Sequence, residues 1–550
     1  MAKRPRSRPD PVAAAGLHPV LVGLAFAVLG LLVYSPALHA PFFSDDQHYV
    51  QANAHIQNLT LDNWIAIWSP TSVVVTLVEN WAPVHLTLHA FAWAWFGPEV
   101  LGHHVLGVLM HALASTLLYV FFVRLGLSRS VSGGLAAFFL VHPAGVEAVA
   151  WISQLKTTSA LVLTLAALLC HPRRPAWALL CFVLALLAKP AALVALPVAL
   201  IWGVVDRDHA DRRIWLWGWG LALVAFSVAE LAAFYETAGR SPSPYESFEE
   251  QLRSHVGIVL RYAVITVSGT PVGLFHEPPA ARNWLDPWWL GGLLLLVAIG
   301  ARAWVSFRRR SPELVFWTWA AAAWAPASGI LTLPYPMADR YLYFVLPGLA
   351  GAAAYVLADA WRALAPRFGS PTFPRWAGAV LSLVLLLAFG VAANRQANRW
   401  ALPERLLLQT EQAYPDGQVA RLREARRTAR AGDADATVAL LRPAMARGFD
   451  RLDVLLSDPS YRQLRGHEGF DAIVDELAQR IVDRVAARED PSQVELRVSA
   501  QALFVLGELA ASEDAYGRAL ALPGPHEQAI RRELEAVRLE RRLESVRAPR

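Results

Sequence analysis

The sequence is short of cysteine and of charge, and it lacks the signatures of two common enzyme classes. Only Cys170 and Cys181 occur in 550 residues, both in apolar runs, so no disulfide framework holds the chain together. There is no Gly-rich phosphate loop and no pair of histidines four residues apart that encloses a glutamate, so nucleotide hydrolysis and zinc proteolysis have no support. With 17% charged and 55% hydrophobic residues, the chain is too apolar for one soluble domain of this length.

Long apolar runs dominate the first 393 residues. The 21 tryptophans fit a protein whose aromatic rings anchor at lipid–water interfaces. A helix needs roughly 20 apolar residues to cross a bilayer. About eleven runs meet or approach this length, which predicts an all-α polytopic membrane domain over 18–393 with spans near 18–38, 100–123, 131–150, 155–171, 175–188, 190–206, 214–234, 288–306, 313–333, 338–360 and 375–393.

Two of these spans share one apolar stretch, 175–206, which Lys189-Pro190 interrupts. The stretch is too long for a single crossing. Because proline removes a backbone donor and clashes with the preceding helical turn, we expect a hairpin at this dipeptide and two spans.

Basic residues are concentrated in the N-terminal tail, 1–17, and in alternate loops, which predicts the orientation of the chain. Cytoplasmic loops carry an excess of Lys and Arg, so we expect the tail inside and the two longest loops, 39–99 and 235–287, outside. The first loop contains 61–68, whose Trp spacing predicts a helix in the interface plane. The second contains an amphipathic stretch around 250–268. The basic residues of the predicted inner loops include Arg124, Arg129, Arg173, Arg174, Arg302, Arg308, Arg309, Arg310 and Arg362.

The composition changes at about residue 394, where amphipathic patterns of helical period replace the long apolar runs. Glycine and proline separate short helical stretches, and paired helices of this length are typical of helical-repeat domains. We therefore predict a tetratricopeptide-like domain over 394–550, although there is no clean 34-residue period. An odd number of spans places it outside the cytoplasm. The stretches are 421–447, 471–489, 498–520 and 527–546.

Two adjacent carboxylates, Asp45 and Asp46, directly follow the first span. A charged side chain at the centre of a membrane helix costs roughly 2.5–3.5 kcal/mol, so such groups usually face a cavity or a partner. On the predicted layout, further ionisable groups fall on the same outer face, which predicts a shared polar site there. A carboxylate beside basic residues suits group transfer from an anionic leaving group. The further groups are His89, His104, His142, Glu147, Lys156, Lys189, Asp339 and Arg340.

Several short motifs occur along the membrane part of the chain: Phe43-Ser44-Asp45-Asp46, Asn80-Trp81-Ala82-Pro83, Gly102-His103-His104 with His111, His142-Pro143, Glu147 to Trp151 with Lys156, Ala188-Lys189-Pro190 with Leu196-Pro197, and Met337 to Tyr343. With these motifs the chain resembles the GT-C superfamily of glycosyltransferases, which use polyprenyl-phosphate-linked sugars. Within it, the chain is similar to the transmembrane and tetratricopeptide-repeat O-mannosyltransferases and their bacterial relatives. It departs from their pattern at Ala82, Gly107 and Gln154–Thr157.

The resemblance implies roles for these residues. Asp45 would be the general base, and Asp46 would orient it or hold a divalent cation, since metal use varies in the superfamily and no cofactor is otherwise implied. The candidate ligands of the donor phosphate are Lys156, Lys189 and Arg340. The candidate substrate-binding residues are Glu147, His142, His89, His104 and Asp339.

The resulting hypothesis is a transferase of the bacterial inner membrane whose active site faces outward. It would move a mannose-like sugar from a polyprenyl-phosphate donor to a protein Ser/Thr hydroxyl, and the tetratricopeptide-like domain would bind the acceptor protein. Two other classes stay open at this point: a non-catalytic scaffold anchored in the membrane, and a transporter or polymerase of a lipid-linked glycan. Glu230 is the only plausible acidic residue of a transport path within a later span, and its place near the outer end of that span makes no path across the midplane.

Overall fold

The computed structural model describes residues 18–78, 80–206, 214–237, 245, 247–329, 335–364, 366, 373–446, 448–488, 491–522 and 526–547. The predicted basic tail, 1–17, lies outside these residues, and so does part of the predicted outer loop 235–287. The described residues form helices and no strand. They divide into two compact units, the first made of residues 1–70, 81–231 and 245–410, and the second of 71–80, 232–244 and 411–550.

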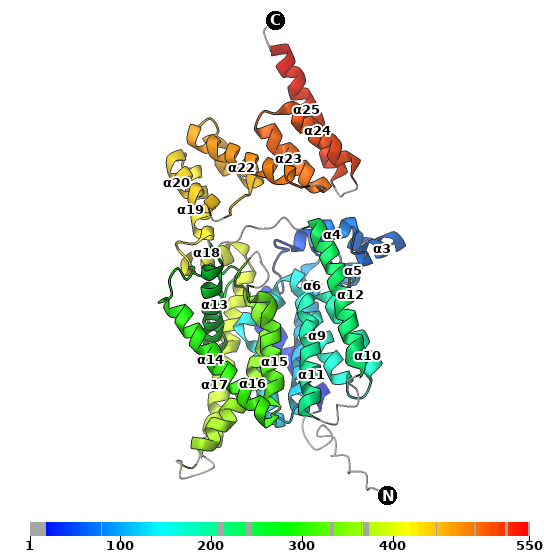
Figure 1. The fold of residues 1–550 in the computed structure, drawn as a ribbon, viewed down its shortest axis with the longest axis vertical. Helices are drawn as coiled ribbons and strands as arrows, with labels where there is room; N and C mark the ends of the chain where they lie inside the picture. Colours follow the sequence, from blue (N-terminus) through cyan, green and yellow to red (C-terminus); the bar gives the residue numbers. More distant parts are fainter. Residues whose placement is uncertain are drawn as a thin grey trace. The chain divides into compact units, whose positions relative to one another are not determined.

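The first unit contains the apolar helices (Figure 1). Seven described helices are long and apolar enough to cross a membrane, or eight if the bent pair formed by α7 and α8 is counted as one span. The seven helices or helix pairs are Pro19–Ala37 (α1 and η1), Val100–Arg124 (α6), Ile152–Cys170 (η4 and α9), Ile214–Ala233 (within α12, Ile214–Thr237), Pro287–Arg309 (α14), Asp339–Leu364 (α16) and Ala377–Trp400 (within α17, Phe373–Trp400). The chain is therefore an integral membrane protein, and each of the eleven predicted spans contains a described helix, although not every one of these helices is long enough to cross a membrane.

Three of the predicted spans form shorter helices. The span predicted at 313–333 is α15 (Glu313–Trp324), which stops before Pro326 and Gly329, where φ is +87°. The apolar stretch around Lys189 forms α10 (Pro175–Ala188) and α11 (Ala195–Val205). The break falls at Lys189 as predicted, and the two helices pack against different neighbours: α10 lies along α9 (Leu155–Cys170), whereas α11 packs against α15.

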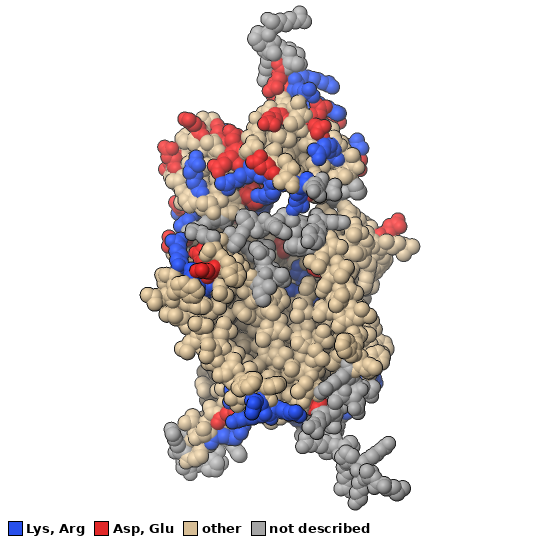
Figure 2. Space-filling view, viewed as in Figure 1, with Lys and Arg blue, Asp and Glu red and all other residues tan. Residues whose placement is uncertain are grey.

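The helices of the first unit differ in how much of their surface is covered. In α9, 72% of the most apolar window is buried within the unit, against 11% in each of α14 and α17. The uncovered residues are apolar, among them Leu294 and Leu385. Helices that are apolar all round face lipid on the sides that no neighbour covers. The space-filling view shows this apolar flank, with Lys and Arg gathered at one end of the unit (Figure 2).

The remaining helices of the first unit lie between the long apolar helices. The predicted interface helix is α3 (Leu61–Trp68), and the predicted amphipathic stretch is α13 (Phe248–Ser268). The remaining elements are η2 (Gln47–Gln51), α2 (Ala54–Gln57), α5 (Pro83–Phe96), α7 (Arg129–Val141), η3 (Pro143–Gly145), α8 (Val146–Ala150), η4 (Ile152–Gln154), η5 (Pro190–Val194), η7 (Ala325–Ala327) and α18 (Pro403–Ala413).

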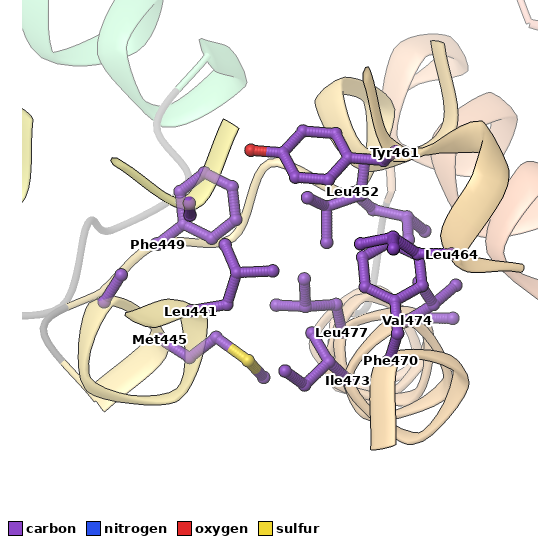
Figure 3. Packing of buried hydrophobic residues seen from close by; sticks show 14 of the residues in the cluster. Leu441, Met445, Phe449, Leu452, Tyr461, Leu464, Phe470, Ile473, Val474 and Leu477 are labelled. Carbon is purple, nitrogen blue, oxygen red and sulfur yellow. The ribbon is translucent and has the colours of Figure 1, made fainter. Parts of the chain in front are cut away.

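The second unit is built from amphipathic helices that pack in succession. Their apolar faces meet in a core that includes Leu441, Phe449, Tyr461 and Phe470 (Figure 3). The last membrane helix, α17, ends at Trp400. The second domain therefore begins later than the predicted residue 394. The elements are α4 (Val73–Val78), α19 (Gln418–Arg430), α20 (Ala434–Ala446), α21 (Leu452–Ser457), η9 (Pro459–Leu464), α22 (Glu468–Ala486), α23 (Gln493–Val505), α24 (Leu509–Ala521) and α25 (Glu527–Arg547).

Candidate active site

A short buried segment, residues 141–155, lies at the centre of the site, and every residue in it is buried. Its path bends by 55° between α7 and the η3–α8 pair, because Pro143 cannot continue the helix that ends at Val141. We call residues 141–155 the central segment. It joins the two aspartates, the basic residues and the start of α16 through hydrogen bonds.

Asp46 fixes the loop after α1 to the central segment. Its Oδ2 accepts from the backbone N–H of Phe43 at 3.0 Å, and its Oδ1 accepts from the backbone N–H of Ser153 at 2.7 Å and from the Ser153 hydroxyl. The indole of Trp151 adds a bond to the Phe43 carbonyl at 3.2 Å. Burial raises the pKa of Asp46 to about 7, while the bonds from Ser153 and Phe43 lower it. Asp46 is therefore an anchoring residue.

Asp45 is the more accessible member of the pair. It is partly exposed, and its side chain accepts from the Ser44 hydroxyl at 3.1 Å. Ser44 has a left-handed backbone with φ of 52°, which costs an L residue about 1–2 kcal/mol. Asp45 interacts electrostatically with Tyr335, whose ring centroid lies 5.6 Å from the guanidinium carbon of Arg340. The structure thus places a carboxylate with free lone pairs in the neighbourhood of a cation.

Glu147 and Arg340 form a buried ion pair between α8 and α16. One carboxylate oxygen of Glu147 accepts from the Arg340 guanidinium, and the other accepts from the Arg340 backbone N–H at 2.7 Å. The Glu147 side chain is 1% exposed and that of Arg340 is 15% exposed. The rings of Trp151, Tyr335 and Tyr341 surround the guanidinium, with centroids 5.1–5.8 Å from its central carbon. Glu147 therefore holds Arg340 in one orientation.

The two lysines lie beside this ion pair. Lys156 Nζ donates to the Tyr49 hydroxyl at 3.2 Å, and Lys189 Nζ donates to the Thr157 hydroxyl at 2.6 Å. Lys189 is within electrostatic range of Lys156, Arg340 and Glu147. The structure thus brings the three predicted phosphate ligands into one region. Like charges gathered in a buried region favour an anionic ligand, because it offsets their mutual repulsion.

Asp339, the neighbour of Arg340, points to a different partner. Its Oδ1 lies 2.8 Å from His276 Nε2, and its Oδ2 accepts from the backbone N–H of Gly273 at 2.7 Å. Both side chains are 2% exposed. Asp339 therefore ties the loop after α13 to the first turn of α16, and its buried side chain has a structural role.

This contact predicts a pH dependence. Burial lowers the pKa of His276, but the charge and hydrogen bond of Asp339, with Glu147 nearby, raise it more, against Arg261, so the net shift is upward. A raised histidine pKa adds stability that is complete below the ordinary value and is lost as the pH rises through the shifted one. We expect the thermal stability to fall as the pH rises above the ordinary histidine pKa of about 6.5, and His276→Gln to flatten that slope. An equal slope in His276→Gln and in the unsubstituted protein would contradict the assignment.

Two predicted substrate-binding histidines have structural partners instead. His142 uses Nδ1 to accept from the backbone N–H of Ala144 at 3.2 Å, and its Nε2 lies 3.2 Å from the Thr266 carbonyl. His104 Nε2 lies 3.0 Å from the Ala40 carbonyl, across 64 residues of chain. Both ring nitrogens of His142 thus have partners, as is usual for buried imidazoles, whereas Nδ1 of His104 is buried without a partner among the residues that the structure describes. These contacts give no support to a substrate role for either residue.

His89 is placed differently, together with its neighbour His85, which was not among the candidate substrate-binding residues. Both lie on the buried face of α5, with ring centroids 4.4 Å apart. Sequence reasoning also missed Tyr49, Ser153 and Thr157, which fix the charged residues. Tyr49 could have been found from its spacing, because it lies four residues after Asp45. Ser153 could not, because its contact with Asp46 joins residues 107 apart and leaves no local pattern.

The residues that the structure describes show no preformed site for the predicted divalent cation. They contain no group of three or more His, Cys, Asp or Glu side chains that could hold a metal ion. Asp46, the predicted ligand, already accepts three hydrogen bonds. A divalent cation at Asp46 therefore stays a prediction, since one or two carboxylates and a substrate phosphate are enough to hold Mg²⁺. The steps described below use only the side chains of this protein.

The fold and these contacts define a polytopic integral membrane protein with a buried charged site. No protein-family model matches the chain. It is similar to the protein O-mannosyl-transferase Tmtc1 of Drosophila melanogaster, with 30% identity over 225 residues. The match covers 38% of this chain and 26% of the fly protein, so the chain spans about a quarter of the length of that relative.

Two solved structures of ArnT from Cupriavidus metallidurans also align with the chain. The apo form gives 18% identity and a TM-score of 0.34, covering 85% of this chain and 81% of ArnT. The form bound to undecaprenyl phosphate gives 14% identity and a TM-score of 0.32, covering 90% of this chain and 79% of ArnT.

Proposed function

We propose that the chain is a membrane glycosyltransferase that moves a sugar from a polyprenyl-phosphate donor to an extracytoplasmic hydroxyl. The observation that carries the proposal is that the central segment holds both the loop of Asp45 and the side chain of Arg340. Through Ser153 it fixes the loop that bears Asp45, and through Glu147 it fixes Arg340. A base and a phosphate-binding cation are thus held by one short piece of backbone.

The transfer step uses these groups in two roles. The Asp45 carboxylate takes the proton of the acceptor hydroxyl as its oxygen bonds to the anomeric carbon of the sugar. The bond from that carbon to the phosphate oxygen breaks, and the oxygen leaves with the electron pair as polyprenyl phosphate. Arg340, Lys156 and Lys189 stabilise the negative charge that develops there. Arginine suits this role because it stays charged and can grip a phosphate with two N–H groups.

The sequence similarity supports the choice of sugar and acceptor. The matched relative is a protein O-mannosyl-transferase, so a mannose-like sugar and a protein Ser/Thr hydroxyl are the substrates we propose. The site faces outward in the bacterial inner membrane, since Arg-rich loops mark the cytoplasmic side. This sidedness rests on the basic ends of α14 and α16, where Arg302 and Arg362 pair with Asp359.

We further propose that the second unit binds the acceptor protein. Successive helices pack pairwise in it, as in repeat proteins that bind partners along one surface. Its charged surface residues pair across neighbouring helices, for example Arg497 with Glu533 and Arg538 with Glu513. The apolar faces of these helices are buried in the core. Binding of an acceptor protein would therefore use polar side chains on the surface.

Mass spectrometry of extracytoplasmic glycoproteins tests the function. Deleting the gene should remove hexose from specific Ser or Thr residues, and the wild-type gene should restore it. Purified protein should also transfer hexose from a polyprenyl-phosphate donor to the peptides so identified. If the deletion leaves every glycosite unchanged while partner proteins lose their membrane attachment, the scaffold alternative replaces this proposal. Accumulation of an unmodified lipid-linked glycan would instead favour the transporter.

A further inference from the structure

Two neighbouring histidines on α5 have no hydrogen-bond partner. His85 and His89 are 0% and 1% exposed, and none of their four ring nitrogens has a partner among the residues that the structure describes. A buried polar group without a partner costs about 1–3 kcal/mol, and folded proteins contain few of them. Four such atoms side by side point to a ligand that supplies the missing bonds.

Other unsatisfied polar atoms lie around this pair. The indole N–H of Trp81 is buried without a partner, and its ring stacks on Phe226 of α12 at 6.0 Å. Glu230 lies one helical turn after Phe226, and its Oε2 is also buried without a partner among the described residues. Glu230 and both histidines are within electrostatic range of Lys156. Both histidines and Glu230 are therefore gathered around one of the candidate phosphate ligands, and Trp81 joins them through its stacking on Phe226, one turn from Glu230.

The histidines act as neutral groups here. Burial lowers the pKa of His85, with His89, Lys156 and Lys189 adding to the effect, and burial lowers the pKa of His89 to about 3. A neutral imidazole has one N–H donor and one acceptor nitrogen. With an indole donor and a carboxylate acceptor beside them, they suit a ligand whose groups both donate and accept. Hydroxyl groups do both, and a phosphate does not donate when it is ionised.

We infer that His85, His89, Trp81 and Glu230 form the subsite for the hydroxyl-rich sugar ring of the lipid-linked donor. The inference rests on the proposed function and names the part of the donor that this cluster recognises. Tyr49 connects this subsite to Lys156. Its ring lies 5.1 Å from the His85 ring, and its hydroxyl accepts a hydrogen bond from Lys156. A donor whose phosphate meets Lys156 would place its first sugar, which is bonded to that phosphate, beside the histidines. Tyr49 and Trp81 would supply aromatic faces for the C–H groups of the ring.

Binding of two lipids by the full chain in nanodiscs tests the inference. The probes are polyprenyl phosphate and the same lipid carrying mannose, with a glucose-bearing lipid as a second sugar. Two or three hydrogen bonds to the sugar should make the wild type prefer a sugar-bearing lipid by about tenfold. In His85→Leu and His89→Leu this preference should fall towards one, while the affinity for bare polyprenyl phosphate stays the same.

Thermal stability separates a binding role from a structural one. Because the ring nitrogens have no partners, His85→Leu and His89→Leu should keep or raise the stability of the empty protein. The matched control is His104→Leu, which removes a buried imidazole bonded to the Ala40 carbonyl; it should lower stability and leave the sugar preference of the remaining folded protein intact.

Two results would overturn the inference. The first is a wild type that binds bare and sugar-bearing lipids equally well, and the second is a pair of His→Leu variants that retain the sugar preference. Either would mean that water or a structural contact satisfies these groups, and the proposed function would survive. A wild type that binds neither lipid would overturn the proposed function and the inference with it.

Discussion

Asp45→Asn should lower the rate of sugar transfer by about 10²–10⁴-fold, the range that a general base contributes. Asparagine has the shape of aspartate but cannot take the proton of the acceptor hydroxyl. The protein should insert and melt as the wild type does, because the one hydrogen bond that the Asp45 side chain makes, from Ser44, can be accepted by the amide oxygen. Transfer from a polyprenyl-phosphate donor to peptide, together with a melting curve, measures both effects.

Asp46→Asn is the matched control for that variant. Asp46 accepts backbone N–H groups on both oxygens, from Phe43 and from Ser153, and an asparagine amide offers only one oxygen. One N–H would then face the amide NH₂ group, which should cost about 1–3 kcal/mol of stability. The pair of variants thus separates chemistry from anchoring. If Asp45→Asn retains full transfer, or if it destabilises the protein as much as Asp46→Asn does, Asp45 is not the base.

The second large effect concerns the ion pair between Glu147 and Arg340. Arg340→Gln should lower stability by about 3–5 kcal/mol, because it leaves a buried carboxylate without its cation. Transfer should fall as well, since the donor phosphate loses a cation. Adding Glu147→Gln should restore most of the stability, because the two amides are neutral, but it should not restore transfer.

A double-mutant cycle on purified protein measures this coupling. Arg340→Lys provides the conservative comparison: it keeps the charge but loses the planar fork, so transfer should fall through weaker donor binding. If the double variant recovers transfer together with stability, Arg340 acts only as a structural partner of Glu147. The donor phosphate would then depend on Lys156 and Lys189 alone.

The helices could be predicted from the sequence because hydropathy and helical period are local properties. Runs such as 100–123 and 288–306 appear as α6 and α14 with boundaries within a few residues. The break at Lys189 could be predicted for the same reason, because the following proline ends a helix locally. The packing of α11 against α15 could not, because the two helices are far apart in the sequence.

Some residues of the site could also be predicted, because charge stands out in an apolar sequence. Charged residues next to membrane spans are costly, so Asp45, Glu147 and Arg340 were visible as exceptions in an apolar chain. Their partners were not, because Asp46 and Ser153 are 107 residues apart and Glu147 and Arg340 are 193 apart. His104 and His142 were indistinguishable from ligands in the sequence, and only their carbonyl partners show that they tie the backbone together.

The burial of the central segment has a consequence for how this gene can change over time. Each residue from 141 to 155 is enclosed by other parts of the first unit, and a few of them hold the loop of Asp45, the cation of α16 and the start of α9 at once. A substitution there must satisfy several neighbours together, whereas an apolar exchange on the outer face of α14 or α17 meets only lipid. Lineages that descend from this protein should therefore diverge quickly along their lipid-facing helices and keep these fifteen positions almost fixed.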